Sequence, residues 1–212
     1  MAAPPPDGTP HAASSPAAPS LEDGLLLECV VTSTNEDGST NVAPMGPIVD
    51  PTFTWALLRP FAGSTTLSNL QRDRRGVLNV TDDVELIAHS ALNQLDEPPP
   101  LIETPCGAAL AAGCRWYALE AASLDTSRER SEIVCQVVGT ARLRDFVGFN
   151  RAKHAVIEAT ILATRLDYLA PVDVLQQVDR LAPPVDKTGG PAERRAFAFV
   201  RDYIARHPAI EG

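Results

Sequence analysis

The sequence predicts an α+β protein, a mostly antiparallel β-barrel of about six strands followed by a C-terminal helical region. Residues 25–143 contain short runs of apolar and β-branched side chains, separated by turn signals such as Asn35-Glu-Asp-Gly38, which is typical of antiparallel strands. From Asn150 onward the apolar residues recur at helical spacing. We therefore expect a barrel over residues 21–145 and helices over residues 146–212.

Before the barrel, residues 1–20 consist mainly of Ala, Pro and Ser and have almost nothing to bury, so we expect a disordered tail. The expected strands cover residues 25–34, 41–49, 52–58, 77–80, 114–124 and 132–143, the last two forming the longest hairpin. Two short helices are expected over residues 65–72, ended by Gly76, and over residues 84–92, started by a capping box of Asp82 and Glu85. Prolines between residues 98 and 105 predict an irregular loop.

Three helices are expected in the C-terminal region. The first covers Asn150–Leu169 and is stopped by Pro171. The second covers residues 172–181, and the third covers residues 192–206. Between them, the prolines and glycines of residues 183–191 predict a linker.

The composition argues against several classes of function. The 212 residues carry 18 Lys and Arg against 27 Asp and Glu, so nucleic acid is not an expected partner. No apolar run reaches the roughly 18 residues of a membrane span, and the chain does not start like a secretory signal, so no membrane partner is expected. The four cysteines lack zinc-ligand spacing, and Asp82-Asp83 has no third ligand nearby, so no metal site is predicted. We expect a cytoplasmic protein with reduced cysteines.

The stretch from Arg59 to Asn69 has the features of a phosphate site. An arginine precedes a glycine turn, and a hydroxyl-rich helix start follows, where free N–H groups and the helix dipole favour an anion. The alternative is that Ser64 or Thr65 merely caps the helix. If a phosphate does bind here, the expected ligands are Arg59, Ser64, Thr65, Thr66 and Asn69.

The stretch from Asn41 to Pro47 suits a planar ring. Pro44 and Pro47 cannot donate to a neighbouring strand, so the N–H groups of Met45 and Gly46 are available to a ligand. An ordinary edge strand explains the prolines equally well. Together the two stretches predict a planar phosphorylated cofactor, for which FMN is the first candidate and a pterin or pyridoxal phosphate the alternative.

The first C-terminal helix places Asn150, His154, Glu158 and Arg165 nearly on one face. One interpretation is a solvated face on which Glu158 pairs with His154. The other is a stripe beside a ligand pocket or a subunit interface. His154 would then be a candidate catalytic proton donor, because histidine titrates near neutral pH.

Several motifs occur in the same order as in one known family: Asn41-Val-Ala-Pro-Met-Gly46, Arg59-Pro-Phe-Ala-Gly-Ser-Thr65, Asn69-Leu70, Asn79-Val-Thr-Asp-Asp83, Phe149-Asn-Arg-Ala-Lys-His154 and Glu158-Ala-Thr-Ile-Leu-Ala-Thr-Arg165. Over residues 25–205 the chain thereby resembles a family of unknown function within the flavin-reductase-like, FMN-binding split barrels. The resemblance implies an FMN-binding homodimer with the flavin near the subunit interface. It adds Asn41, Ala43, Asn150 and Arg151 to the expected cofactor-binding residues.

The resemblance supplies no reaction. The first functional hypothesis is an FMN-dependent oxidoreductase with a small-molecule redox partner, since the cofactor itself can carry the chemistry. The second is a non-catalytic flavin carrier, sensor or scaffold dimer.

Overall fold

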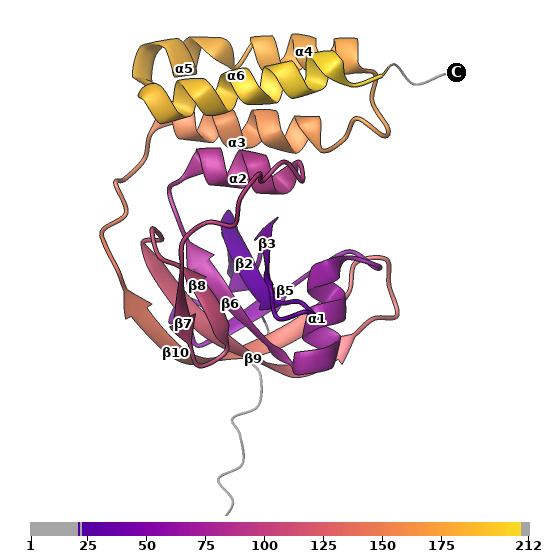
Figure 1. Ribbon diagram of the computed structural model, residues 1–212, viewed down its shortest axis with the longest axis vertical. Coiled ribbons are helices and arrows are strands. Elements are labelled where there is room, and N and C mark those ends of the chain that lie inside the picture. Colours follow the sequence, from indigo (N-terminus) through magenta and orange to yellow (C-terminus); the bar gives the residue numbers. More distant parts are fainter. Residues whose placement is uncertain (1–20, 22, 209–212) are drawn as a thin grey trace, which may run out of the picture.

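The computed structural model describes residue 21 and residues 23–208, so the predicted N-terminal tail lies outside the described residues. Figure 1 shows a curled sheet beneath a layer of helices, with α1 at one side of the sheet and α2 between the sheet and the helical layer. The strands are β1 (Leu25–Leu26), β2 (Cys29–Thr34), β3 (Thr40–Met45), β4 (Ile48–Val49), β5 (Trp55–Leu58), β6 (Arg75–Val80), β7 (Leu101–Thr104), β8 (Gly107–Leu110), β9 (Arg115–Asp125) and β10 (Glu132–Arg142). The helices are α1 (Thr65–Asp73), α2 (Val84–Ala91), α3 (Arg151–Ala163), α4 (Pro171–Asp179), α5 (Ala182–Thr188) and α6 (Pro191–Arg206).

The main sheet has eight strands in the order β1-β4-β5-β10-β9-β6-β2-β3, and every pairing is antiparallel. The predicted hairpin of β9 and β10 is confirmed, and it lies at the centre of this sheet. β7 and β8 form a separate two-stranded sheet. At one end of the order, β3 pairs with β2 and with no other strand of the described residues. An antiparallel split barrel followed by helices is therefore the fold, as the sequence predicts.

Two apolar cores hold the molecule together. One fills the curled sheet and includes Val31, Leu58 and Ile133, with Leu67 and Leu70 of α1 packed into it. The other joins α2 to the C-terminal helices. Because α2 carries apolar residues on opposite faces, it contacts the helical layer and, through a smaller cluster, β2 and β8. Each Val, Leu, Ile or Phe side chain buried in these cores contributes roughly 1.5–3 kcal/mol relative to exposure.

The prediction of irregular structure was wrong in two proline-containing segments. The loop expected between residues 98 and 105 contains β7, because Pro98–Pro100 precede the strand and Pro105 lies in the tight turn to β8. The linker expected at residues 183–191 contains α5, whose first turn holds Pro183 and Pro184. Proline is tolerated in a first helical turn because that turn has no intrahelical N–H bonds to lose.

Several boundaries also differ from the prediction. α1 is followed by Arg74 at φ 58°, a left-handed conformation, and not by Gly76. Gly76 lies inside β6, where an added Cβ would come within 3.3 Å of the Thr32 carbonyl oxygen. α3 ends at Ala163, well before Pro171, which begins α4 instead.

The predicted capping box is wrong, since α2 is capped by Asp83, whose side chain accepts the Leu86 N–H at 3.0 Å. Asp82 instead binds Arg144 through two hydrogen bonds of 2.6 and 3.0 Å and accepts the Val147 N–H at 3.1 Å. Asp82 follows β6, and the other two residues belong to the segment between β10 and α3. Their contacts therefore tie the sheet to the start of the helical layer.

Candidate functional site

The N-terminal end of α1 presents free N–H groups. Ser64 is the N-cap, and its Oγ accepts the Leu67 N–H at 3.3 Å. Ahead of it, the Ser64 N–H donates to the Phe61 carbonyl at 3.2 Å, and Gly63 takes φ 76°, which closes a tight turn. Among the residues that the structure describes, no hydrogen bond involves the N–H of Thr65 or Thr66. The predicted cap and the predicted anion-binding geometry are thus compatible here.

Arg59 lies just before this turn, and no described residue accepts a hydrogen bond from its side chain. Its Nε is buried, and no hydrogen bond or ion pair to it is found within residue 21 and residues 23–208. A buried donor without a partner costs roughly 1–3 kcal/mol, so the site fits an anionic ligand that would satisfy the guanidinium.

Thr66 and Asn69, by contrast, are held in a polar network beneath α1. The Asn41 amide donates to Thr66 Oγ1 at 2.9 Å, and the Asn69 amide donates to Ser33 Oγ at 3.0 Å and to Asn35 Oδ1 at 2.9 Å. Three predicted site residues are therefore brought together, but their contacts position α1 on β2 and β3. Ser33 and Asn35 completed the network without any sequence signal, because the pairings span up to 36 residues.

A ligand can reach the backbone edge of β3 more readily than the side chains of this strand. Asn41, Ala43 and Met45 alternate, so their side chains share the face that points toward α1 and the barrel core, and Met45 packs against that core. The outer edge of β3 has no neighbouring strand among the described residues. At about 3.4 Å per residue, Asn41 and Met45 lie roughly 14 Å apart, a length comparable to extended FMN.

Gly46 follows β3 and permits an approach from outside the sheet. Its φ is not positive, and an added Cβ would meet Leu26 at an ordinary contact of 3.4 Å. No hydrogen bond from its N–H to another described residue is found. The N–H predicted to face a planar ring is therefore available, although neither backbone strain nor crowding requires the glycine.

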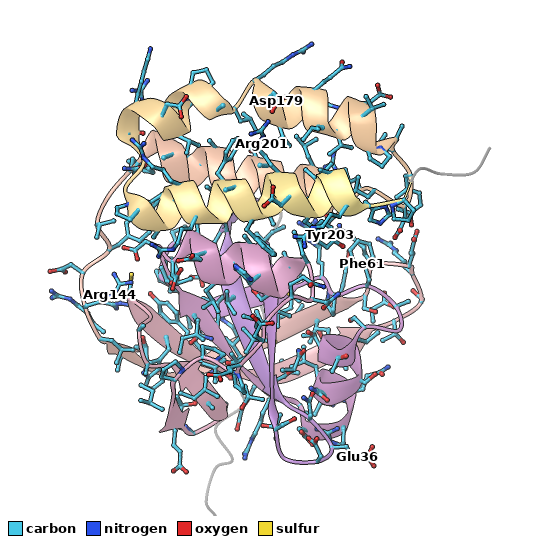
Figure 2. The ribbon with its side chains drawn as sticks, turned by 45° about the horizontal axis from the view of Figure 1, so that its top comes forward. Glu36, Phe61, Arg144, Asp179, Arg201 and Tyr203 are labelled. Carbon is cyan, nitrogen blue, oxygen red and sulfur yellow. The ribbon has the colours of Figure 1, made fainter. Side chains whose placement is uncertain are left out.

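The start of α3 lies away from the turn before α1. The Asn150 side chain caps α3 by accepting the Ala152 N–H at 2.8 Å, and its amide donates to the Thr188 carbonyl. The next turn places Lys153 against the Asp82 carbonyl oxygen at 2.6 Å, beside Arg144. Figure 2 shows Arg144 and Phe61 on opposite sides of the molecule, so one chain does not bring this end of α3 to the turn before α1.

His154 and Arg151 are exposed on α3. The interpretation that His154 pairs with Glu158 is wrong, because none of the ion pairs among the described residues joins them. Instead, the His154 ring lies 5.9 Å from the ring of Phe149, which is 95% exposed. Partial burial of Glu28 raises the pKa of its carboxyl, and the nearby Glu158 charge raises it further. Because Glu28 precedes Cys29, which pairs with Met45, this part of α3 lies toward the Met45 end of β3.

Other features do not extend the site. A cleft of about 630 Å³ lies at the opposite end of α1, between Asp73–Arg75 and the β7–β8 turn. Within the described ranges, no cluster of three metal-ligating side chains occurs, and all four cysteines are free and buried. No helix there is long and apolar enough to cross a membrane.

Within the described residues, the fold is an antiparallel split barrel in which the start of α1, with its free N–H groups, lies beside an unpaired sheet edge. The chain matches the family described as "Protein of unknown function (DUF447)", by its N-terminal domain over residues 27–144 and its C-terminal part over residues 150–202. It therefore belongs to the DUF447 family.

Among the solved structures that resemble the chain are an FMN-bound protein and a flavin reductase. An FMN-bound protein from Methanosarcina mazei that matches the same family superposes with a TM-score of 0.70 and 22% identity, covering 84% of this chain and 94% of that one. The flavin reductase HpaC, complexed with NADP+, gives a TM-score of 0.50 and 17% identity, covering 60% of this chain and 84% of that one. At these identities the two structures establish the flavin-reductase-like fold.

Proposed function

We propose that this protein binds FMN, with the phosphate at the turn between Arg59 and Thr66 and the ring along the free edge of β3. The observation that carries the proposal is the buried Arg59 Nε, which has no acceptor among the described residues, next to a helix start where the N–H groups of Thr65 and Thr66 have none there either. The FMN-bound relative from Methanosarcina mazei supports the choice of cofactor. The length of β3 between Asn41 and Met45 supports the orientation.

In this arrangement the chain binds and orients the cofactor. Arg59 gives charge-assisted hydrogen bonds to the phosphate, and the hydroxyls of Ser64 and Thr65 with the N–H groups of α1 complete the shell. Asn41, Thr66 and Asn69 hold α1 in place. The Gly46 N–H donates to the polar rim of the ring. When bound, FMN supplies reversible electron and hydride transfer.

Titration with FMN tests the binding. We expect Arg59→Met to weaken FMN affinity about tenfold or more, because a hydrogen bond to a charged group contributes roughly 1.5–3 kcal/mol. Arg165→Met, which changes an exposed arginine in the turn after α3, is the control. A colourless protein whose spectrum does not respond to added FMN would refute the proposal.

We further propose that the protein is an FMN-dependent oxidoreductase with a small-molecule redox partner. The alternative is a non-catalytic flavin carrier, sensor or scaffold dimer. Anaerobic mixing of the FMN-loaded protein with NADH, NADPH or a reduced deazaflavin separates the two, since only the oxidoreductase loses its flavin absorbance rapidly. His154→Asn should then change the pH profile of turnover without releasing the flavin.

Finally, we propose a homodimer with the flavin near the interface. The segment before α3 supports a covering subunit, because Phe146, Val147 and Phe149 are 49%, 69% and 95% exposed. A second copy would also explain how Asn150 and Arg151 reach a flavin from which they are separated within one chain. Sedimentation of the FMN-loaded protein measures the mass, and a monomer would refute this part.

A further inference from the structure

We propose that Arg130 is the second cation of the phosphate subsite and makes the protein select FMN over riboflavin. The inference rests on the proposed function, because it assumes that the cofactor phosphate lies at the turn between Arg59 and Thr66. It concerns the loop between β9 and β10, a part of the chain in which the sequence shows no motif.

The pairing of β5 with β10 continues past the end of β5 and carries this loop to the turn. Leu58 pairs with Ile133, and the same register joins Phe61 to Arg130 in an isolated bridge. Two backbone hydrogen bonds fasten the segments, from Ser131 N–H to the Pro60 carbonyl at 3.1 Å and from Ala62 N–H to the Glu129 carbonyl at 2.9 Å. The position of Arg130 is therefore set by the register of the β5–β10 pairing and by these two hydrogen bonds.

This register also decides which side chains share a face. Since strand side chains alternate, Arg59 and Phe61 lie on one face together with Arg130, and the buried Leu58 and Ile133 lie on the other. Diagonal neighbours on such a face are about 7–8 Å apart, within reach of two arginine side chains converging on one anion.

The guanidinium of Arg130 stacks on the Phe61 ring and forms no ion pair with a described carboxylate. Its Cζ lies 4.2 Å from the centroid of the Phe61 ring, and Phe61 is 53% exposed at the side of the molecule (Figure 2). None of the ion pairs found among the described residues includes Arg130. By the same register Glu132 lies opposite Arg59 on this face, but its carboxylate lies 3.5 Å from Arg128, and no ion pair among the described residues joins it to Arg59 or Arg130. Two arginines that form no ion pair with a described carboxylate therefore border the same turn.

The stacking geometry suits a phosphate. A guanidinium that lies over an aromatic ring keeps its N–H groups free at its edge, where they can donate in pairs to phosphate oxygens. The Phe61 carbonyl accepts the Ser64 N–H, which places this ring within one turn of the free N–H groups at the start of α1. Riboflavin has no phosphate and would gain nothing from either arginine.

The experiment compares FMN and riboflavin binding by quenching of flavin fluorescence on the full chain. We expect Arg130→Met to weaken FMN binding about tenfold, to leave riboflavin binding within twofold, and to flatten the salt dependence of FMN affinity. Phe61→Leu, which removes the ring beneath the guanidinium, should give a smaller loss of the same selectivity. Arg128→Met, in the same loop with its side chain 72% exposed, is the matched control and should change neither ligand.

The outcomes separate this inference from the proposed function. If the unchanged protein binds FMN and Arg130→Met keeps the full preference over riboflavin, the role of Arg130 is refuted while FMN binding stands. Equal weakening by Arg130→Met and Arg128→Met would show only a general charge effect and would also overturn it. If the unchanged protein binds neither flavin, the proposed function itself fails and the inference fails with it.

Discussion

The contact between Asp82 and Arg144 allows a quantitative prediction about how the sheet and the helical layer are joined. Asp82 is 7% exposed, whereas the Arg144 side chain is 39% exposed. The hydrogen bonds from Arg144 lower the pKa of Asp82 from 3.8 to about 2, against the opposing effect of burial, and the Val147 N–H adds to the lowering. Replacing Asp82 with Asn keeps the shape and removes the charge.

The magnitude follows from the pKa. At about 1.4 kcal/mol per pKa unit, the drop from 3.8 to about 2 corresponds to roughly 2 kcal/mol, and the exposure of Arg144 reduces this to about 1–2 kcal/mol. Because the folded-state pKa is below the unfolded one, this stabilisation is present above about pH 4 and is lost as the pH falls toward 2. For a chain of this size it corresponds to roughly 2–8 °C in Tm.

Urea unfolding of Asp82→Asn and of the unchanged protein, measured from pH 3 to pH 7, is the assay. Asp145→Asn is the control, because Asp145 pairs with Arg142 at the surface and is 81% exposed, so its replacement should cost less than 0.5 kcal/mol. Equal stability of Asp82→Asn and the unchanged protein at pH 7 would refute the reasoning. A deficit that does not shrink between pH 4 and pH 3 would equally contradict the assigned pKa.

Two further predictions concern stability. Partial burial first, and the Glu158 charge second, raise the pKa of Glu28 above 4.5, so the folded state is weakened as the pH rises through that pKa. Glu28→Gln should therefore raise Tm slightly at pH 7 and have no effect below pH 4; a loss of stability at pH 7 would contradict this. Gly63→Ala should cost about 1–2 kcal/mol in chemical denaturation, because φ is 76°, whereas Gly46→Ala should cost little. Equal costs would show that φ is not the cause.

Local patterns in the sequence determined most of the elements of this protein. Alternation and the Asn35–Gly38 turn predicted the hairpin of β2 and β3, and the polar run after Gly63 predicted the start of α1. These features depend on neighbouring residues, whose spacing is visible along the chain. The same holds for the candidate phosphate turn, since a helix start and its preceding arginine lie within a few residues.

Contacts between distant segments were decided only by the tertiary structure. Asp82 has the spacing of a helix cap, yet Arg144, which lies 62 residues away, takes its carboxylate. Thr66 and Asn69 are polar residues near the candidate phosphate site, yet their side chains hydrogen-bond to residues of β3 and β2. Arg130 reaches the turn before α1 only because β10 pairs with β5. In each case the competing partner is absent from the local sequence, so no local pattern distinguishes a ligand-binding group from one that another strand satisfies.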